Sequence, residues 1–210
     1  MGFLLAISFV AVTVILLRLF ALRRRAVIPY LIEKEIDKLK PGDDPEHLRH
    51  LIQDDNSPLS RIVEVALRPF NATKQETLEV VQSRARQEIV RMESGLFILE
   101  IVVGIAPLLG LLGAVTGLVK VFSNIGSGVM STADLKGIAS GIGEALSTTI
   151  VGLAIAIPAL AAFSYFSRRV ERFAVEMESL LTDLVEKIFQ GSRRGEPYPS
   201  EVESLEEAAR

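Results

Sequence analysis

A carboxylate and several hydroxyls lie in a strongly apolar stretch of the chain, and these are the side chains there that could do chemistry. The stretch runs from Gly141 to Phe163, reads GIGEALSTTIVGLAIAIPALAAF, and has Glu144, Thr148 and Thr149 near its beginning. In lipid such polar groups are costly and often mark an ion or proton pathway. At about 100° per helical residue, Thr148 lies on the same face as Glu144, whereas Thr149 lies about 140° away. Two structural alternatives compete with a pathway: a solvated Glu144 at the membrane interface, and hydroxyls bonded to their own helix.

A second apolar stretch, IVVGIAPLLGLLGAVTGLV from Ile101 to Val119, carries fewer polar groups. Its one hydroxyl belongs to Thr116, which lies about 200° around a helix from Ala114. Glu100 directly precedes the stretch. A carboxylate at that position is by default an interfacial group, and the alternative is a proton relay at the inner mouth of a pathway.

Small residues recur on one face of each stretch and predict close helix packing, because small side chains let helix backbones approach in lipid. They include Gly110, Gly113, Gly117 and Gly152. Such packing fits both contact between helices of one chain and contact between the subunits of an oligomer. Pro107 and Pro158 each lack the N–H that would bond the carbonyl four residues earlier, at Val103 and Ala154, and each can also kink its helix.

Three stretches are long enough to cross a bilayer, since about 20 helical residues span its hydrocarbon core. They predict an all-α integral membrane protein with spans at residues 1–22, 94–122 and 141–167. Arginines gather after the first span, before the second and after the third, whereas the Gly- and Ser-rich link at 123–140 is nearly free of basic residues. By the positive-inside rule, the N-terminus and this link face outward and the C-terminus faces the cytoplasm.

The remaining segments predict helices outside the membrane. Residues 23–93 form a cytoplasmic segment, in which Ser57 before a proline is typical of a helix start. From Thr73 onward we expect one helix that runs unbroken into the second span. The third span continues as a helical extension at 168–190, whose apolar stripe favours packing on the cytoplasmic helices over partner binding. Residues 191–210 have the composition of a disordered tail.

Composition and motifs exclude several classes of function. The formal net charge of −3 offers no overall attraction for nucleic acid, and the chain has no Cys for thiol chemistry. His47 and His50 alone do not make a metal site, because such sites need more ligands. The sequence has no phosphate-binding glycine loop, nucleophile elbow or metal-ligand cluster. We therefore expect neither an enzyme nor a metal protein.

The motifs APLLGLLGAVTGLVKVF and GIGEALSTTIVGLAIAIPALAAFSYF together resemble the core spans of the ExbB/TolQ/MotA family of proton-channel subunits. With three expected spans, the chain is similar to the ExbB/TolQ branch and not to the four-span flagellar branch. The resemblance implies a homopentameric ring around a dimer of an ExbD/TolR-like single-span protein, whose aspartate binds and releases the proton. It also implies a bacterial inner-membrane location, proton-motive force in place of a cofactor, and work delivered through a TonB- or TolA-like protein.

The same resemblance implies roles for individual residues. Thr149 matches the family's pore-lining threonine of the third span, and Glu144 matches a glutamate at the outer mouth or between subunits. Both prolines match as well. Ala114 stands where many ExbB-like members have threonine, and Thr116 points too far around the helix to replace it. A polar pathway would therefore depend more on Thr149 and water.

Two hypotheses for the function follow. In the first, the chain is a ring subunit of a motor that conducts protons and energises envelope transport of the TonB-dependent type. In the second, it is a non-conducting scaffold of an envelope complex, tolerant of hydroxyl loss but sensitive to bulk at Gly113, Gly117 or Gly152. A hydroxyl-lined path without dense carboxylates favours protons over sodium. The envelope system that would be energised stays open.

Overall fold

A computed structural model describes residues 2–68, 73–125 and 132–192, and every regular element in this part is a helix. In chain order the helices are α1 (Gly2–Ala21), α2 (Arg24–Val27), α3 (Tyr30–Lys38), α4 (Glu46–Gln53), α5 (Pro58–Ala66), α6 (Lys74–Ser94), α7 (Phe97–Ile125) and α8 (Thr132–Ser192). The chain divides into two compact units, one of residues 1–20 and 93–168 and one of residues 21–92 and 169–210. We call them the first and the second unit.

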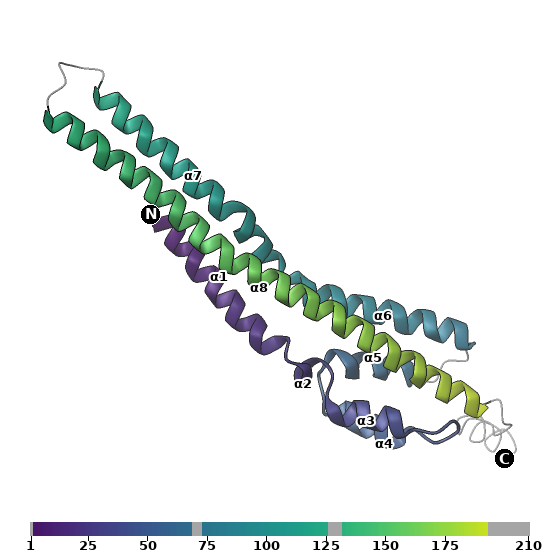
Figure 1. Cartoon of the computed structure of the whole chain (residues 1–210). Coiled ribbons are helices and arrows are strands. Elements are labelled where there is room, and N and C mark those ends of the chain that lie inside the picture. The colour runs from purple at the N-terminus through teal and green to yellow at the C-terminus, as the bar shows by residue number, and fades with distance from the viewer. Residues whose placement is uncertain (1, 69–72, 126–131, 193–210) are drawn as a thin grey trace, which may run out of the picture. The chain divides into compact units, whose positions relative to one another are not determined.

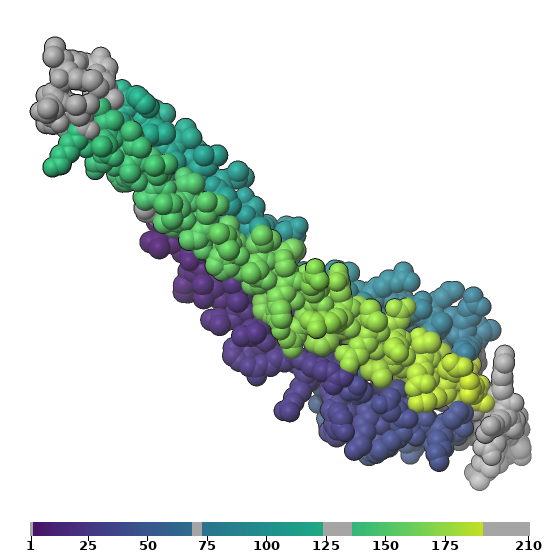
Figure 2. Space-filling model, in the orientation of Figure 1, coloured from purple at the N-terminus to yellow at the C-terminus, as the bar shows by residue number. Residues whose placement is uncertain are grey.

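The first unit consists of α1, α7 and the N-terminal part of α8, which lie side by side (Figure 1). In the space-filling view α1, in purple, lies along the green part of α8 (Figure 2). All three helices contribute to a core of small and β-branched side chains: Ala11, Val102, Ala106, Ala156 and Ala159. Small residues at these positions allow the helices to pack closely.

Three helices are long and apolar enough to cross a membrane, which confirms the three expected spans. They are α1, the apolar part of α7 and the apolar part of α8. Large side chains on the outside of α1, such as Phe3, Phe9 and Leu17, are exposed. In water such a face would be unfavourable, so it suits contact with lipid.

The second unit consists of α2 to α6 and the C-terminal part of α8 (Figure 1). Its core combines Ile32 and Ile36 of α3 with Leu59 and Ile62 of α5, all almost fully buried. The apolar stripe on the extension of α8 is buried as well, at Val170, Phe173, Met177, Leu181 and Leu184. The stripe therefore packs within this unit, as the helical spacing predicts. Ser57 caps α5 by accepting a hydrogen bond from the Ser60 amide, also as predicted.

The expectation of one unbroken helix from Thr73 into the second span is wrong. A turn at residues 95–96 separates α6 from α7. There the Leu96 amide donates to the Glu93 carbonyl, three residues earlier, instead of to the carbonyl four residues earlier as in an α-helix. Gly95 favours such a break because glycine is a poor helix former. The absent side chain also makes room for Arg18 of α1, whose Nη2 lies 1.0 Å from where a Cβ on Gly95 would stand.

The helices also extend into the segment that the sequence assigns to a loop at 123–140. The helix α7 continues to Ile125 and α8 begins at Thr132. The expected tail at 191–210 lies outside the described residues, apart from the last turn of α8.

Candidate functional site

In the first unit α7 and α8 approach each other closely at the predicted glycines. A Cβ on Gly152 would lie 2.7 Å from the Ala106 carbonyl oxygen and 3.0 Å from the Gly110 Cα. Further along, a Cβ on Gly113 would lie 3.2 Å from the Thr148 side chain, and one on Gly117 would lie 3.1 Å from Ala145 Cβ. As the residue numbers of the contacts increase along α7, those of their partners on α8 decrease, so the two helices are antiparallel. Backbone touches backbone where Gly110 meets Gly152.

Thr149 lies at this contact and bonds across it. Its hydroxyl donates to the Gly110 carbonyl on α7 at 3.3 Å, which is a long hydrogen bond, and the side chain is half-buried. The Gly110 carbonyl belongs to the helical ladder of α7, so it can accept this second bond with its other lone pair. The Thr149 hydroxyl thus reaches α7 and remains partly open to its surroundings.

The neighbouring hydroxyls instead bond to their own helices. Thr148 donates to the Ala145 carbonyl at 2.6 Å, and Ser147 donates to the Glu144 carbonyl at 2.7 Å. Thr116 donates to the carbonyls of the preceding turn, Leu112 at 2.9 Å and Gly113 at 3.0 Å. Such internal bonds are the usual fate of a hydroxyl in a transmembrane helix. Of these four hydroxyls, Thr149 is the one that links two helices.

Of the other predicted pathway residues, Thr148 also lies at this contact, next to Gly113. Glu144 and Thr116 are exposed, and Ala114 is buried with 7% of its surface accessible. The two prolines lie within helices that continue through them, Pro107 in α7 and Pro158 in α8. Neither proline has an N–H for the carbonyl four residues earlier.

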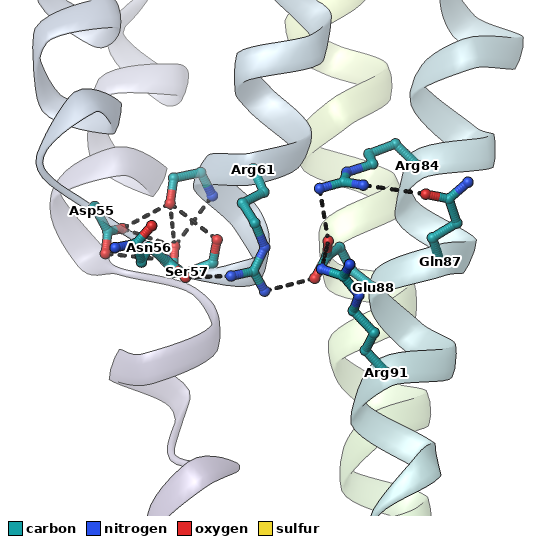
Figure 3. A network of polar contacts seen from close by, with 9 residues as sticks. Asp55, Asn56, Ser57, Arg61, Arg84, Gln87, Glu88 and Arg91 are labelled. Atoms are coloured by element: carbon teal, nitrogen blue, oxygen red, sulfur yellow. Dashed lines mark hydrogen bonds and ion pairs between the residues drawn. The ribbon is translucent and has the colours of Figure 1, made fainter.

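Sequence reasoning missed a buried carboxylate in the second unit, Glu88 on α6. Its side chain is 0% exposed and contacts three arginines: Arg61 at 2.6 Å, Arg84 at 3.2 Å and Arg91 at 3.2 Å. Figure 3 shows Arg61 reaching across from α5 to this carboxylate. The spacing of Arg84 and Arg91 around Glu88 on one helix was a readable signal. The contribution of Arg61, from a different helix, was not.

A second ion-pair group in the same unit joins helices that are distant in sequence. Arg24 of α2 pairs with Glu33 of α3 at 2.9 Å and with Glu176 of α8. The hydrogen bond to Glu176, followed by that to Glu33, raises the pKa of Arg24 above its ordinary value. His47 and His50 are exposed, and no group of potential metal ligands occurs among the described residues. The ion pairs of Arg24 thus tie α2 to α3 and α8.

Comparison with known proteins agrees with the motifs in the spans. Residues 54–179 match the model of the MotA/TolQ/ExbB proton channel family, which is more than half of the chain. The ExbB-like protein 1 of Synechocystis sp. is 37% identical over 143 residues, covering 66% of this chain and 54% of that protein. The ExbB-like protein 3 of the same organism is 29% identical, covering 95% of this chain and 93% of that protein. The biopolymer transport protein ExbB of Neisseria gonorrhoeae is 31% identical, covering 70% of this chain and 71% of that protein.

Proposed function

Because this chain belongs to the MotA/TolQ/ExbB proton channel family, we propose that it is a ring subunit of a motor driven by proton-motive force. In this proposal it conducts protons together with an ExbD/TolR-like single-span partner and energises envelope transport of the TonB-dependent type. The matched family and the three apolar helices support a role for the chain as a membrane protein of a proton-channel family.

The observation that carries the proposal is the Thr149 hydroxyl at the closest contact of α7 and α8. It donates to the Gly110 carbonyl at 3.3 Å and so links α8 to α7. A hydroxyl can donate one proton and accept another, so it can join a hydrogen-bonded path. A half-buried hydroxyl at a long bond can exchange that bond for a water or a partner's side chain at little cost.

The proposal includes an assembly and an orientation. We expect a homopentamer in the bacterial inner membrane, with the N-terminus in the periplasm and the C-terminus in the cytoplasm. The partner supplies the proton-binding aspartate, and a TonB- or TolA-like protein receives the work. The exposed apolar faces of α1, α7 and α8 supply surface for lipid, for other subunits and for the partner's span.

A non-conducting scaffold is the second candidate, and one observation favours it. The α7–α8 contact is tight enough that Gly152 and Gly110 have no room for a side chain. A protein that only assembles an envelope complex would need this packing and would not need the hydroxyl. The two candidates therefore differ in what they demand of Thr149.

The experiment replaces Thr149 by valine, which has nearly the same shape and no hydroxyl. Subunits are counted by native mass spectrometry with and without the co-expressed partner, and proton flux is measured in liposomes with an entrapped pH dye. The motor predicts five subunits with two partner copies in both proteins, and a flux at least tenfold lower in Thr149→Val. Equal flux in the two proteins, or a monomer or dimer that ignores the partner, would argue for the scaffold.

A further inference from the structure

Glu100 is the one acidic residue between Ser94 and Ile125, and its carboxylate is uncommitted. Its side chain is exposed, and it forms neither an ion pair nor a side-chain hydrogen bond with the described part of the chain. By contrast, Glu88 on the preceding helix is fully buried and held by three arginines. Glu88 is thus held in place by its ion pairs, whereas the Glu100 carboxylate is available for proton exchange.

Glu100 lies in the first turn of α7, on the side of the helix that carries Pro107, an expected kink residue, and Ala114, an expected pathway residue. Pro107 and Ala114 follow it at intervals of seven, and each such interval rotates the position by only about 20° around a helix. Leu99 and Val102, which are 0% and 5% exposed, lie about 100° and 160° around the helix from Glu100 and form part of the packed face. Glu100 therefore stands at the start of the Pro107–Ala114 stripe and faces away from the packed side chains of Leu99 and Val102.

Backbone acceptors lead from Glu100 toward the α7–α8 contact. The Val103 carbonyl, about 4.5 Å further along the helix axis, lacks its regular donor because Pro107 has no N–H. The Gly110 carbonyl, which accepts from Thr149 at 3.3 Å, lies about 15 Å from Glu100 along the axis. That distance is about half of a 30 Å hydrocarbon core. Glu100 is therefore at a membrane edge when the Thr149–Gly110 contact is near the middle.

A second uncommitted carboxylate lies on the other side of the same contact. Glu144 is the one acidic residue between Lys136 and Arg168, and its side chain is exposed without a partner among the described residues. It precedes Thr149 by about 7.5 Å along α8. Because α7 and α8 are antiparallel, Glu100 and Glu144 lie on opposite sides of the Thr149–Gly110 contact.

We propose that Glu100 is the inner proton-exchange group of this pathway, an inference that rests on the proposed function. Hydroxyls and carbonyls only pass a proton along their hydrogen bonds, whereas a carboxylate can take up a proton and become a neutral carboxylic acid. The Glu100 carboxylate gains one proton from the path, becomes a carboxylic acid, and releases the same proton to cytoplasmic water. The side chain returns to its starting state. Water and the partner's aspartate span the distance between Glu100 and Thr149.

The first test measures proton flux of the complex with its partner in liposomes, under an imposed potential. Glu100→Gln should lower the flux at least tenfold, and Glu100→Asp should keep a substantial part of it. Glu79→Gln, which removes an exposed carboxylate on α6, is the matched control and should conduct like the wild type. If the wild type conducts protons and Glu100→Gln conducts equally well, this inference is overturned and the proposed function stands. No flux in the wild type overturns the proposed function and this inference with it.

A second test restores the acid after folding, using the fact that the chain has no Cys. Purified Glu100→Cys complex is treated either with 2-carboxyethyl methanethiosulfonate, which adds a carboxylate, or with methyl methanethiosulfonate, which adds a neutral group. Both samples come from one preparation, so assembly is identical. The inference expects flux to return with the first reagent and not with the second. Return with both, or with neither after complete labelling by mass, overturns it.

Discussion

Three glutamates, two on α6 and one on α7, lie in three different environments, and the expected effects of replacing them differ accordingly. Glu88 is buried among arginines, while Glu76 caps the first turn of α6 and Glu100 is exposed without a partner. A carboxylate that is surrounded by charges contributes mainly to stability, because removing it leaves the opposite charges uncompensated. An exposed one without partners contributes little to stability and is free for function.

Replacing Glu88 by glutamine should destabilise the second unit strongly. Arg61, Arg84 and Arg91 would then surround a neutral amide in a buried position. Breaking a buried ion pair costs about 3 kcal/mol or more, although the partial exposure of the arginines reduces this. Urea unfolding of the full chain in detergent, followed by circular dichroism, measures the loss.

The matched control is Glu64→Gln, which removes a surface ion pair with Arg68 in which both side chains are 58% exposed. Such pairs are worth about 0–1 kcal/mol. Equal unfolding midpoints for Glu88→Gln and Glu64→Gln would show that the arginine cluster is not a stabilising tie.

The cap of α6 should weaken in acid. The Thr73 amide, followed by the Thr73 hydroxyl, donates to the Glu76 carboxylate and lowers its pKa below the ordinary value of 4.5. Because the folded pKa is the lower one, this stabilisation is complete above the unfolded pKa and is lost as the pH falls through the folded pKa. Carbon-13 NMR of labelled Glu side chains should find Glu76 titrating below 4.5. Thr73→Ala removes the hydroxyl donor but keeps the hydrogen bond from the backbone amide, so the pKa of Glu76 should rise only part of the way to its ordinary value. Titration at or above 4.5 in the wild type would contradict the cap.

At the scale of elements, the contact of α7 with α8 depends on the absence of side chains at particular glycines. Gly152→Val should separate the helices, because even a Cβ there would lie 2.7 Å from a backbone oxygen of Ala106. Overpacking of this kind costs about 1–3 kcal/mol. Thermal unfolding and the fraction of intact oligomer in detergent measure it.

Gly104→Val is the control for this substitution, since Gly104 lies on α7, the partner helix of the same contact, and a Cβ there meets nothing within 4 Å. It should leave both the oligomer and the midpoint of unfolding nearly unchanged. If Gly104→Val and Gly152→Val behave alike, bulk in these helices matters irrespective of the α7–α8 contact.

At the scale of the whole molecule, the charge pattern predicts which segments face the cytoplasm. In the Cys-free chain, Gln53→Cys on α4 should be protected from a membrane-impermeant maleimide added outside the inner membrane, and Ser123→Cys near the end of α7 should react. Permeabilising the membrane should expose Gln53→Cys. The parent chain has no Cys and should remain unlabelled. The reverse pattern of labelling would invert the proposed orientation.

The family was identified from two motifs in the spans, and the match over residues 54–179 confirms it. The three apolar helices and the cap at Ser57 also follow from sequence alone. These features depend on local composition and on spacing along one helix, which the sequence displays directly. The stripe on α8 likewise has the helical spacing of a packed face, and its side chains are buried.

Contacts between helices depended on the tertiary structure, because they require the rotation and register of both partners. Thr149 bonds to Gly110, which is 39 residues away, and Arg61 reaches Glu88 from another helix. The break between α6 and α7 has the same origin: Gly95 permitted a turn, but a single glycine is tolerated within many helices. The Arg18 side chain of α1 occupies the space that a Cβ on residue 95 would need, and this contact is visible only in the tertiary structure. The sequence by itself therefore determined which helices form and which of their faces are apolar, while the packing decided which polar groups meet.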